Sequence, residues 1–134
     1  MSNGYIESLE NVNSFLLEMK QALCAEGFSF VADFDVLQSG PLNSTGYKNK
    51  TTMAKLHYDN KDVYNILLSL TEEDYSETVP DIKNTSNPPL HVFGREIDSR
   101  EVYIKTKIRK RKRNQVFSLS FHFAEHPIKK PYSK

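Results

Sequence analysis

The chain has 134 residues, of which 38% are hydrophobic and 26% are charged, and its formal net charge is +1; we expect one domain, residues 1–134, that can bury a core. No apolar run approaches the roughly 20 residues of a membrane helix, and the N-terminus lacks a signal-peptide pattern. Because Cys24 is the only cysteine, an internal disulfide is excluded, and we expect a cytoplasmic protein with no membrane partner.

The first half of the chain is predicted to contain a helix, a strand and a long loop. The helix ends before Gly27, and its core-facing stripe, spaced by three or four residues, is Ile6, Leu9, Val12, Leu16, Met19 and Leu23. Alternation over residues 28–36 predicts the strand. The stretch Gln38–Thr51 is rich in Ser, Gly, Asn and Pro, so we expect a mobile loop, which could carry a short helix beginning near Thr51 or Thr52.

The second half is predicted to be two short helical elements followed by strands. A helix begins at Asp59 or Asn60, and its buried stripe is Val63, Ile66, Leu67 and Leu70. The capping pattern of Thr71–Asp74 predicts one more helical turn. The remaining elements, in order, are a polar loop at 79–89, a strand at Leu90–Ile97, a turn at Asp98-Ser99, a hairpin within Glu101–Glu125 and an extended strap at 126–134.

The hairpin is expected to have one apolar face and one polar face. On its first strand the apolar set is Val102, Ile104, Thr106 and Ile108, and the alternate set is Tyr103, Lys105 and Lys107. On its second strand Phe117, Leu119, Phe121 and Phe123 alternate with Ser118, Ser120 and His122. With a short loop such as Arg111-Lys112, Tyr103 comes within roughly 5–7 Å of Ser120 and His122.

This order of elements predicts an α+β fold. The helices pack on one face of a small antiparallel sheet that ends in a C-terminal β-hairpin. The other face, which carries Tyr103, Lys105, Lys107 and His122, is expected to be free of helices and open to a ligand.

Positive charge is concentrated near the C-terminus. Residues 1–101 contain eight Lys/Arg and sixteen Asp/Glu, whereas residues 102–134 contain ten and one, for net charges of −8 and +9. Such a division predicts an anionic partner, with nucleic acid first, although acidic helices could instead neutralise a basic sheet. The basic run would supply phosphate contacts, or alternatively a nuclear-localisation signal; it consists of Arg109, Lys110, Arg111, Lys112 and Arg113.

His122 and His126 belong to a string, HFAEH, that matches the zinc-protease pattern H-x-x-E-H. That pattern needs a helix, whereas the surrounding residues alternate like a strand and Pro127 disfavours helix at His126. We therefore expect no metal site and no cofactor.

The polar face of the hairpin contains groups sufficient for RNA cleavage without a metal. A base must activate the 2′-hydroxyl, cations must stabilise the phosphorane, and an acid must protonate the leaving oxygen. His122 could be the base or the acid, Tyr103 could assist, and Lys105 with Lys107 or Arg109 could bind the phosphate. The alternative is that His122 is a surface histidine and Tyr103 a half-buried strand aromatic.

Four strings, in this order, make residues 60–132 resemble the MqsR-like toxins of type II toxin–antitoxin systems: LSLTEEDY, VFGREI, EVYIKTKI and SLSFHFAEHPIKKPY. The resemblance implies a RelE-like fold and a ribosome-independent endoribonuclease that cuts mRNA until an antitoxin binds it. Tyr103 matches an active-site tyrosine of the family, His122 falls where some members have lysine, and Arg95 in VFGREI joins the expected RNA-binding residues. Glu77 and Leu90 depart from the best-known branch, which has a basic and an amide residue there.

Two other functions compete with the endoribonuclease. The first is a non-catalytic nucleic-acid-binding protein of the same fold, for which the basic run matters and His122 does not. The second is a protein-interaction module whose basic sheet face docks an acidic protein. The expected partners are mRNA and a cognate antitoxin, with no small-molecule cofactor.

Overall fold

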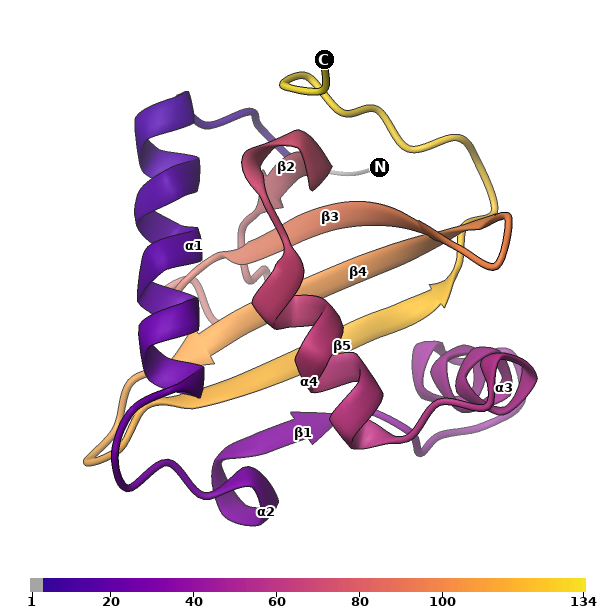
Figure 1. Cartoon of the computed structure of the whole chain (residues 1–134), viewed down its shortest axis with the longest axis horizontal. Helices are drawn as coiled ribbons and strands as arrows, with labels where there is room; N and C mark the ends of the chain where they lie inside the picture. The colour runs from indigo at the N-terminus through magenta and orange to yellow at the C-terminus, as the bar shows by residue number, and fades with distance from the viewer. Residues whose placement is uncertain (1–3) are drawn as a thin grey trace.

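The computed structural model describes residues 4–134 and contains a five-stranded mixed sheet in the order β1-β5-β4-β3-β2 (Figure 1). Its strands are β1 (Phe34–Val36), β2 (Tyr75–Val79), β3 (Leu90–Ile97), β4 (Arg100–Arg109) and β5 (Gln115–Phe123). The α+β class is confirmed. The expectation of a purely antiparallel sheet is wrong, because β1 pairs parallel with β5.

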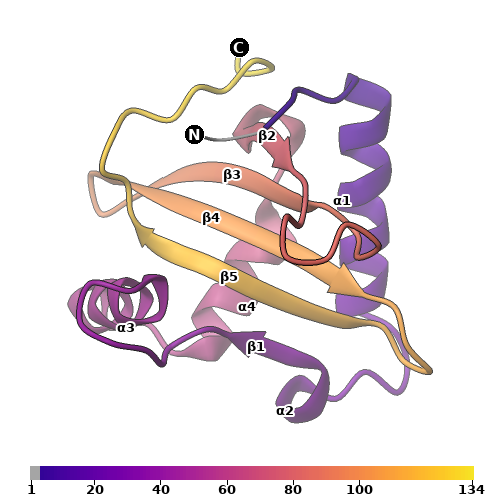
Figure 2. The same cartoon turned by 180° about the vertical axis from the view of Figure 1, so that it is seen from behind.

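Two helices cover one face of the sheet, and a third lies at its edge. The helical elements are α1 (Leu9–Leu23), α2 (Phe30–Asp33), α3 (Thr45–Leu56), α4 (Asn60–Ser69) and the 3₁₀ turn η1 (Glu72–Asp74). Figure 1 shows α1 and α4 in front of the sheet, whereas α3 lies beyond β5; Figure 2 shows the opposite face, here called the outer face, with no helix across it. None of the helices in residues 4–134 is long and apolar enough to cross a membrane.

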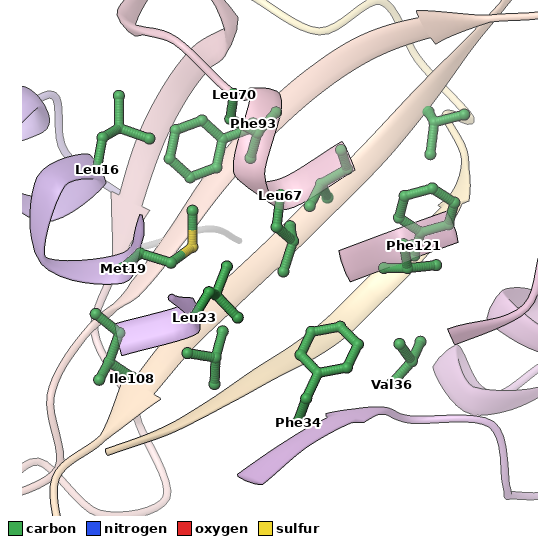
Figure 3. Packing of buried hydrophobic residues seen from close by; sticks show 14 of the residues in the cluster. Leu16, Met19, Leu23, Phe34, Val36, Leu67, Leu70, Phe93, Ile108 and Phe121 are labelled. Carbon is green, nitrogen blue, oxygen red and sulfur yellow. The ribbon is translucent and has the colours of Figure 1, made fainter. Parts of the chain in front are cut away.

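The hydrophobic core lies between α1, α4 and the inner face of the sheet (Figure 3). Each large apolar side chain that is fully buried contributes about 1.5–3 kcal/mol relative to exposure. The residues that fill the centre come from α1, α4 and four strands: Leu16, Met19, Leu23, Phe34, Val36, Leu67, Phe93, Ile104, Ile108 and Phe121.

Helix α1 matches the predicted stripe except at its start. Ser8 caps the helix by accepting a hydrogen bond from the Asn11 N–H at 3.2 Å, so the helix begins at Leu9. Ile6 therefore lies outside it and is 61% exposed, and Leu9 in the first turn is 40% exposed, so the expectation that these two residues belong to the core is wrong. Gly27 lies beyond the C-terminal end of α1 and has a φ of 86°, a conformation that favours glycine.

The strand predicted at 28–36 is confined to its last three residues. Ser29 caps α2 by accepting from the Ala32 N–H at 3.1 Å, and the Ser29 N–H donates to Asp33 Oδ2 at 2.9 Å. These local side-chain bonds satisfy the backbone in a helical turn, which outcompetes the extended conformation that alternation suggests.

The prediction of a loop over Gln38–Thr51 is wrong for its second half, which belongs to helix α3. Ser44 caps α3, whose first residue is Thr45, and Asn49 of this helix is fully buried. The Asn49 side-chain amide donates to the carbonyl oxygens of Leu37 and Leu119, at 2.8 and 3.0 Å, and its oxygen accepts from the Phe121 N–H at 2.8 Å. Helix α3 thus replaces a neighbouring strand along the part of β5 that β1 does not reach.

The elements from Asp59 to Ile97 follow the prediction with one omission. Asp59 and Asp62 form a reciprocal capping box at the start of α4, and η1 forms at the expected place. Strand β2, which was not expected, pairs antiparallel with β3 and is bridged on its other side by Tyr5.

The C-terminal hairpin is confirmed, but a bulge changes its faces. Lys105 pairs with Ser120 and Thr106 pairs with Ser118, so Leu119 is an extra residue in β5. Toward the turn, Phe117 pairs with Lys107 and lies on the outer face rather than in the core. Beyond the bulge Phe121 is buried, as predicted. The connection spans residues 110–114, not the two-residue loop that the alternation suggested.

Candidate functional site

The hairpin register brings Tyr103 and His122 together on the outer face. The two residues are directly paired across β4 and β5, and their rings stack with centroids 5.4 Å apart and planes inclined by 23°. The Lys105 ammonium lies 5.8 Å from the centre of the Tyr103 ring. The predicted association of these three side chains is therefore present in the structure.

Tyr103 and His122 form the floor of a cavity of about 510 Å³, here called the aromatic cavity. Its walls come from segments far apart in the sequence, namely residues 4–6, the β2 residues Ser76 and Glu77, and residues 124–129 of the C-terminal strap. Figure 2 shows the strap leaving β5 and running past the ends of β4 and β3 towards the N-terminal segment. The cavity thus depends on both ends of the chain.

The strap is extended, as predicted, but it leaves the outer face less open than expected. A Cβ atom at Gly94, the β3 residue paired with Tyr103, would come within 2.9 Å of Ile128 Cδ1. The Ile128 N–H donates to Glu101 Oε1 at 2.8 Å, and the Tyr132 hydroxyl donates to the Glu7 carbonyl oxygen at 2.6 Å. The absence of a side chain at Gly94 lets the strap lie directly on β3 and close one side of the cavity.

The ring nitrogens of His122 have different surroundings. Nδ1 lies 3.0 Å from the Phe123 carbonyl oxygen, which can only accept a hydrogen bond, so Nδ1 carries the proton in that contact. Nε2 is then the ring atom that can take a proton from a ligand.

Tyr103 is held in its protonated form. Burial raises the pKa of its phenol, and the nearby Glu77 carboxylate raises it further, because both disfavour the phenolate. Tyr103 therefore presents a hydroxyl donor to the cavity at neutral pH. Glu77, which departs from the residue found in the best-known branch of MqsR-like toxins, lines the cavity. Leu90, the other such departure, pairs with Val79. It is four residues, about 13 Å, along β3 from Gly94, the partner of Tyr103.

Acidic and basic groups of the strap and of α3 surround the cavity rim. Lys48 of α3 forms an ion pair with Glu125, and its hydrogen bond holds the pKa of the Glu125 carboxyl below its ordinary value. His126 and Lys129 also line the cavity. Sequence reasoning missed these two residues, because a linear pattern predicts an extended strap but not the surface on which it lies.

The basic run lies at the other end of the hairpin. Arg109, the first residue of the run and the last of β4, is six residues from Tyr103 along the strand, a span of about 20 Å. The Lys110 ammonium lies 3.4 Å from Glu18 Oε2, and the Arg113 guanidinium lies 3.4 Å from Asp33 Oδ1, while Arg111 and Lys112 are exposed. The structure therefore separates the basic turn from the aromatic cavity.

Two cations lie between the turn and the cavity. Lys107 and Arg109 follow Lys105 at alternate positions of β4, roughly 6.6 Å apart along the strand and on the outer face. The Arg109 guanidinium lies 4.7 Å from the centre of the Phe117 ring. A stripe of cations and half-buried aromatic rings thus connects the two ends of the hairpin.

Arg95 lies apart from the other predicted RNA-binding residues. It pairs with Val102 on the inner face, and its guanidinium forms hydrogen bonds with Asp74 Oδ2 at 2.9 Å and with the Ser69 carbonyl oxygen at 3.1 Å. Burial acts to raise the pKa of Asp74, but the Arg95 guanidinium and the Thr71 N–H outweigh it and hold that pKa below its ordinary value. Arg95 ties β3 to the end of α4 and does not reach the outer face.

The H-x-x-E-H string has no helical geometry. His122 and Phe123 lie in β5, and residues 124–126 follow as an irregular segment. Within residues 4–134, no group of three or more His, Cys, Asp or Glu side chains is arranged to hold a metal ion.

No family model, curated protein or solved structure matches the chain. The resemblance to MqsR-like toxins therefore stays a prediction from the sequence.

Proposed function

We propose that the protein is a toxin-type endoribonuclease that cuts mRNA in the cytoplasm without a metal ion and is neutralised by a cognate antitoxin protein. The observation that carries this proposal is the stacked Tyr103–His122 pair at the floor of the aromatic cavity, with Lys105 beside it. The three side chains provide a base, a hydroxyl donor and a cation within one surface.

The cleavage proceeds by attack of the 2′-hydroxyl on the adjacent phosphorus. His122 Nε2 takes the 2′-hydroxyl proton while the 2′-oxygen forms its bond to phosphorus, and Lys105 offsets the charge on the phosphorane oxygens. The bond to the 5′-oxygen then breaks, and that oxygen takes the Tyr103 proton. The products are a 2′,3′-cyclic phosphate and a 5′-hydroxyl, and the proton returns from His122 to Tyr103 through water.

Replacement of His122 by asparagine tests this assignment. Asparagine keeps a polar side chain but cannot transfer the proton, so His122→Asn should lower the rate of RNA cleavage by about 100-fold to 10,000-fold while RNA affinity is kept. The assay uses purified protein and RNA in the presence of a chelator, with analysis of the product ends. His57→Asn is the matched control, because His57 is exposed at the end of α3 and has a φ of 58°, which asparagine tolerates.

Tyr103→Phe removes only the hydroxyl and should also slow cleavage, whereas Tyr47→Phe on the exposed side of α3 should not. The proposal fails if the wild-type protein leaves RNA intact in the chelator, or if His122→Asn and His57→Asn cleave at the same rate. In cells, expression of the wild type should arrest growth and degrade mRNA, and co-expression of the antitoxin should relieve both effects.

A second candidate is a non-catalytic RNA-binding protein of the same fold. The observation that favours it is the presence of two carboxylates, Glu77 and Glu125, at the cavity, because negative charge opposes the approach of a phosphate. This function predicts that RNA binding is strongly salt-dependent and that no cleavage occurs in the wild type or in His122→Asn. A third candidate, a module that docks an acidic protein on the outer face, predicts weak RNA binding by the wild type.

A further inference from the structure

A second cleft, of about 570 Å³, lies at the turn end of the outer face and is here called the turn cleft. One wall carries four cations from β4 and the turn, Lys107, Arg109, Lys110 and Arg111, and the other wall is residues 84–88 of the loop between β2 and β3. Figure 2 shows this loop beside the end of β4, at the opposite end of the sheet from the C-terminal strap. The two clefts therefore lie at opposite ends of one surface.

The loop wall of the turn cleft is polar and braced by its own hydrogen bonds. Asp81 accepts hydrogen bonds from the Asn87 side chain at 3.1 Å and from the backbone N–H groups of Lys83 and Asn84 at 3.1 and 3.3 Å. These bonds, first that from Asn87, hold the pKa of the Asp81 carboxyl below its ordinary value. The Asp81 oxygens accept hydrogen bonds from the loop itself. On the facing wall the Lys110 ammonium is paired with Glu18, so Lys107, Arg109 and Arg111 set the charge of the cleft.

The cation wall has features that suit a single nucleic-acid strand. The Arg109 guanidinium is held over the Phe117 ring, which orients its planar donors, and planar donors bind phosphate oxygens in pairs. Because the guanidinium covers this half-buried ring, an unstacked base can stack on the guanidinium plane. A duplex keeps the faces of its bases stacked inside, so it could bind the cations through its phosphates but could not stack a base on the guanidinium plane.

We infer that the turn cleft is a phosphate subsite for single-stranded RNA, and that one strand occupies the turn cleft and the aromatic cavity together. This rests on the proposed function, because it takes the ligand of the aromatic cavity to be RNA. Along β4, Arg109 of the turn cleft is about 20 Å from Tyr103, which equals about six nucleotides at the 3.4 Å rise of a stacked strand and fewer in an extended one. The cleaved bond then lies at the aromatic cavity, at one end of the bound strand.

Binding should therefore depend on RNA length. Wild-type protein is titrated with labelled 2′-O-methyl RNA of about three and about twelve nucleotides, lengths that fall on either side of that span. The methyl group removes the attacking hydroxyl, so affinity is measured whether or not the protein cleaves RNA. We expect the longer strand to bind at least about tenfold more tightly than the shorter one and more tightly than a duplex of the same length.

A double substitution tests the turn cleft directly. Arg109→Gln with Arg111→Gln should bring the affinity for the long strand close to that for the short one and reduce the slope of log affinity against log salt by about 1.4, for two lost contacts to a single strand. The matched control, Lys50→Gln with Lys55→Gln, changes the net charge equally at two exposed positions of α3 and should retain the length dependence.

The inference is overturned if long and short strands bind equally, if the duplex binds as tightly as the single strand, or if the control loses as much affinity as the Arg109/Arg111 variant. A parallel assay with unmodified RNA separates this result from the proposed function. Length-dependent binding without cleavage would support an RNA subsite at the turn cleft and refute the endoribonuclease activity. Cleavage without length-dependent binding would support the endoribonuclease activity and refute the subsite.

Discussion

The two ends of the outer face of the β4–β5 hairpin differ in how they are built. At one end, Tyr103 and His122 carry little charge but are enclosed by the N-terminal segment, β2 and the C-terminal strap. At the other end, five consecutive cations occupy the last residue of β4 and the turn, and the loop at 84–88 faces them across the turn cleft. The end with the stronger sequence signal thus has one loop as its facing wall, whereas the walls of the other end come from three segments that lie far apart in the sequence.

The two ends suit two different tasks, RNA binding by exposed cations and proton transfer, although their residues lie close together in the sequence. Exposed cations give affinity that is screened by salt, because water and ions reach them. Proton transfer instead needs groups fixed relative to one another and partly shielded from water, which the stacked Tyr103–His122 pair provides. We therefore assign chemistry to the end with the stacked Tyr103–His122 pair and strand capture to the charged end.

Among the tests of this comparison, the largest effect is expected at Lys105 of β4, and its neighbour on the same face, Lys107, provides the contrast. Lys105→Gln should lower kcat by about 100-fold or more, about 2.7 kcal/mol, because Lys105 lies beside Tyr103 and offsets charge that develops on the phosphorane. Lys107→Gln, one alternate position farther from Tyr103, should raise KM and leave kcat within a few-fold. Steady-state kinetics with a short RNA measures both, and equal changes in kcat would contradict the division.

The next effect concerns the helix that supports the enclosed end. Asn49→Ala removes the partner of the Leu119 carbonyl and the Phe121 N–H beside the β5 bulge, and should lower the free energy of unfolding by about 1–3 kcal/mol. Urea denaturation measures this change. Asn13→Ala, at an exposed position of α1, is the control and should be neutral or slightly stabilising, since alanine favours helix. Equal stability of the two variants would show that α3 does not hold the bulge.

A smaller effect concerns His91, which contacts Glu7 just after the N-terminal segment that lines the cavity, and it should appear in the pH dependence of the free energy of unfolding. His91 is buried, with Nε2 3.0 Å from Glu7 Oε2 and with no hydrogen-bond partner for Nδ1. Burial lowers the pKa of His91 below 6.5, although Glu7 and Glu18 oppose this shift. The unfolded chain therefore binds the proton first, and the free energy of unfolding should decrease as pH falls from about 6.5, by at most about 1.4 kcal/mol per pH unit.

Urea titrations between about pH 7.5 and pH 5 would measure this slope, above the range in which ordinary carboxyl groups titrate. His91→Gln keeps a donor for Glu7 but does not titrate, so the slope should become shallower in that variant. A slope of opposite sign, or one unchanged in His91→Gln, would show that His91 is not the group responsible.

The smallest effect tests whether the strap closes the cavity. Gly94→Ala places a Cβ atom 2.9–3.0 Å from the side-chain ends of Ile128 and Lys130, which can move aside, so stability should change by less than about 1 kcal/mol. The strap should nevertheless be cut faster in limited proteolysis, since it can no longer lie on β3. In an Ile128→Ala background the same substitution should have less effect, and an additive result would mean that Gly94 and Ile128 do not interact.

Much of the second half of the chain could be predicted because its signals are local. Asp59 caps α4 by accepting from the Asp62 N–H, and Asp74 accepts from the Thr71 N–H at the start of η1. Asp98 and Ser99, with φ values of 52° and 67°, form the tight turn before β4. The predictions failed where local and distant interactions compete. Residues 28–33 form a helical turn because of Ser29 and Asp33, and α3 exists where Asn49 can reach β5, a strand 70 residues away.

The sequence by itself determined that Tyr103, Lys105 and Lys107 share one face of β4, because side chains alternate along a strand. It also determined that the hairpin places His122 close to Tyr103. Only the tertiary structure decided that a bulge at Leu119 turns Phe117 outward, that Arg95 faces the helices, and that the strap and N-terminal segment enclose the pair. These outcomes depend on contacts between distant segments, whose energies no local pattern contains.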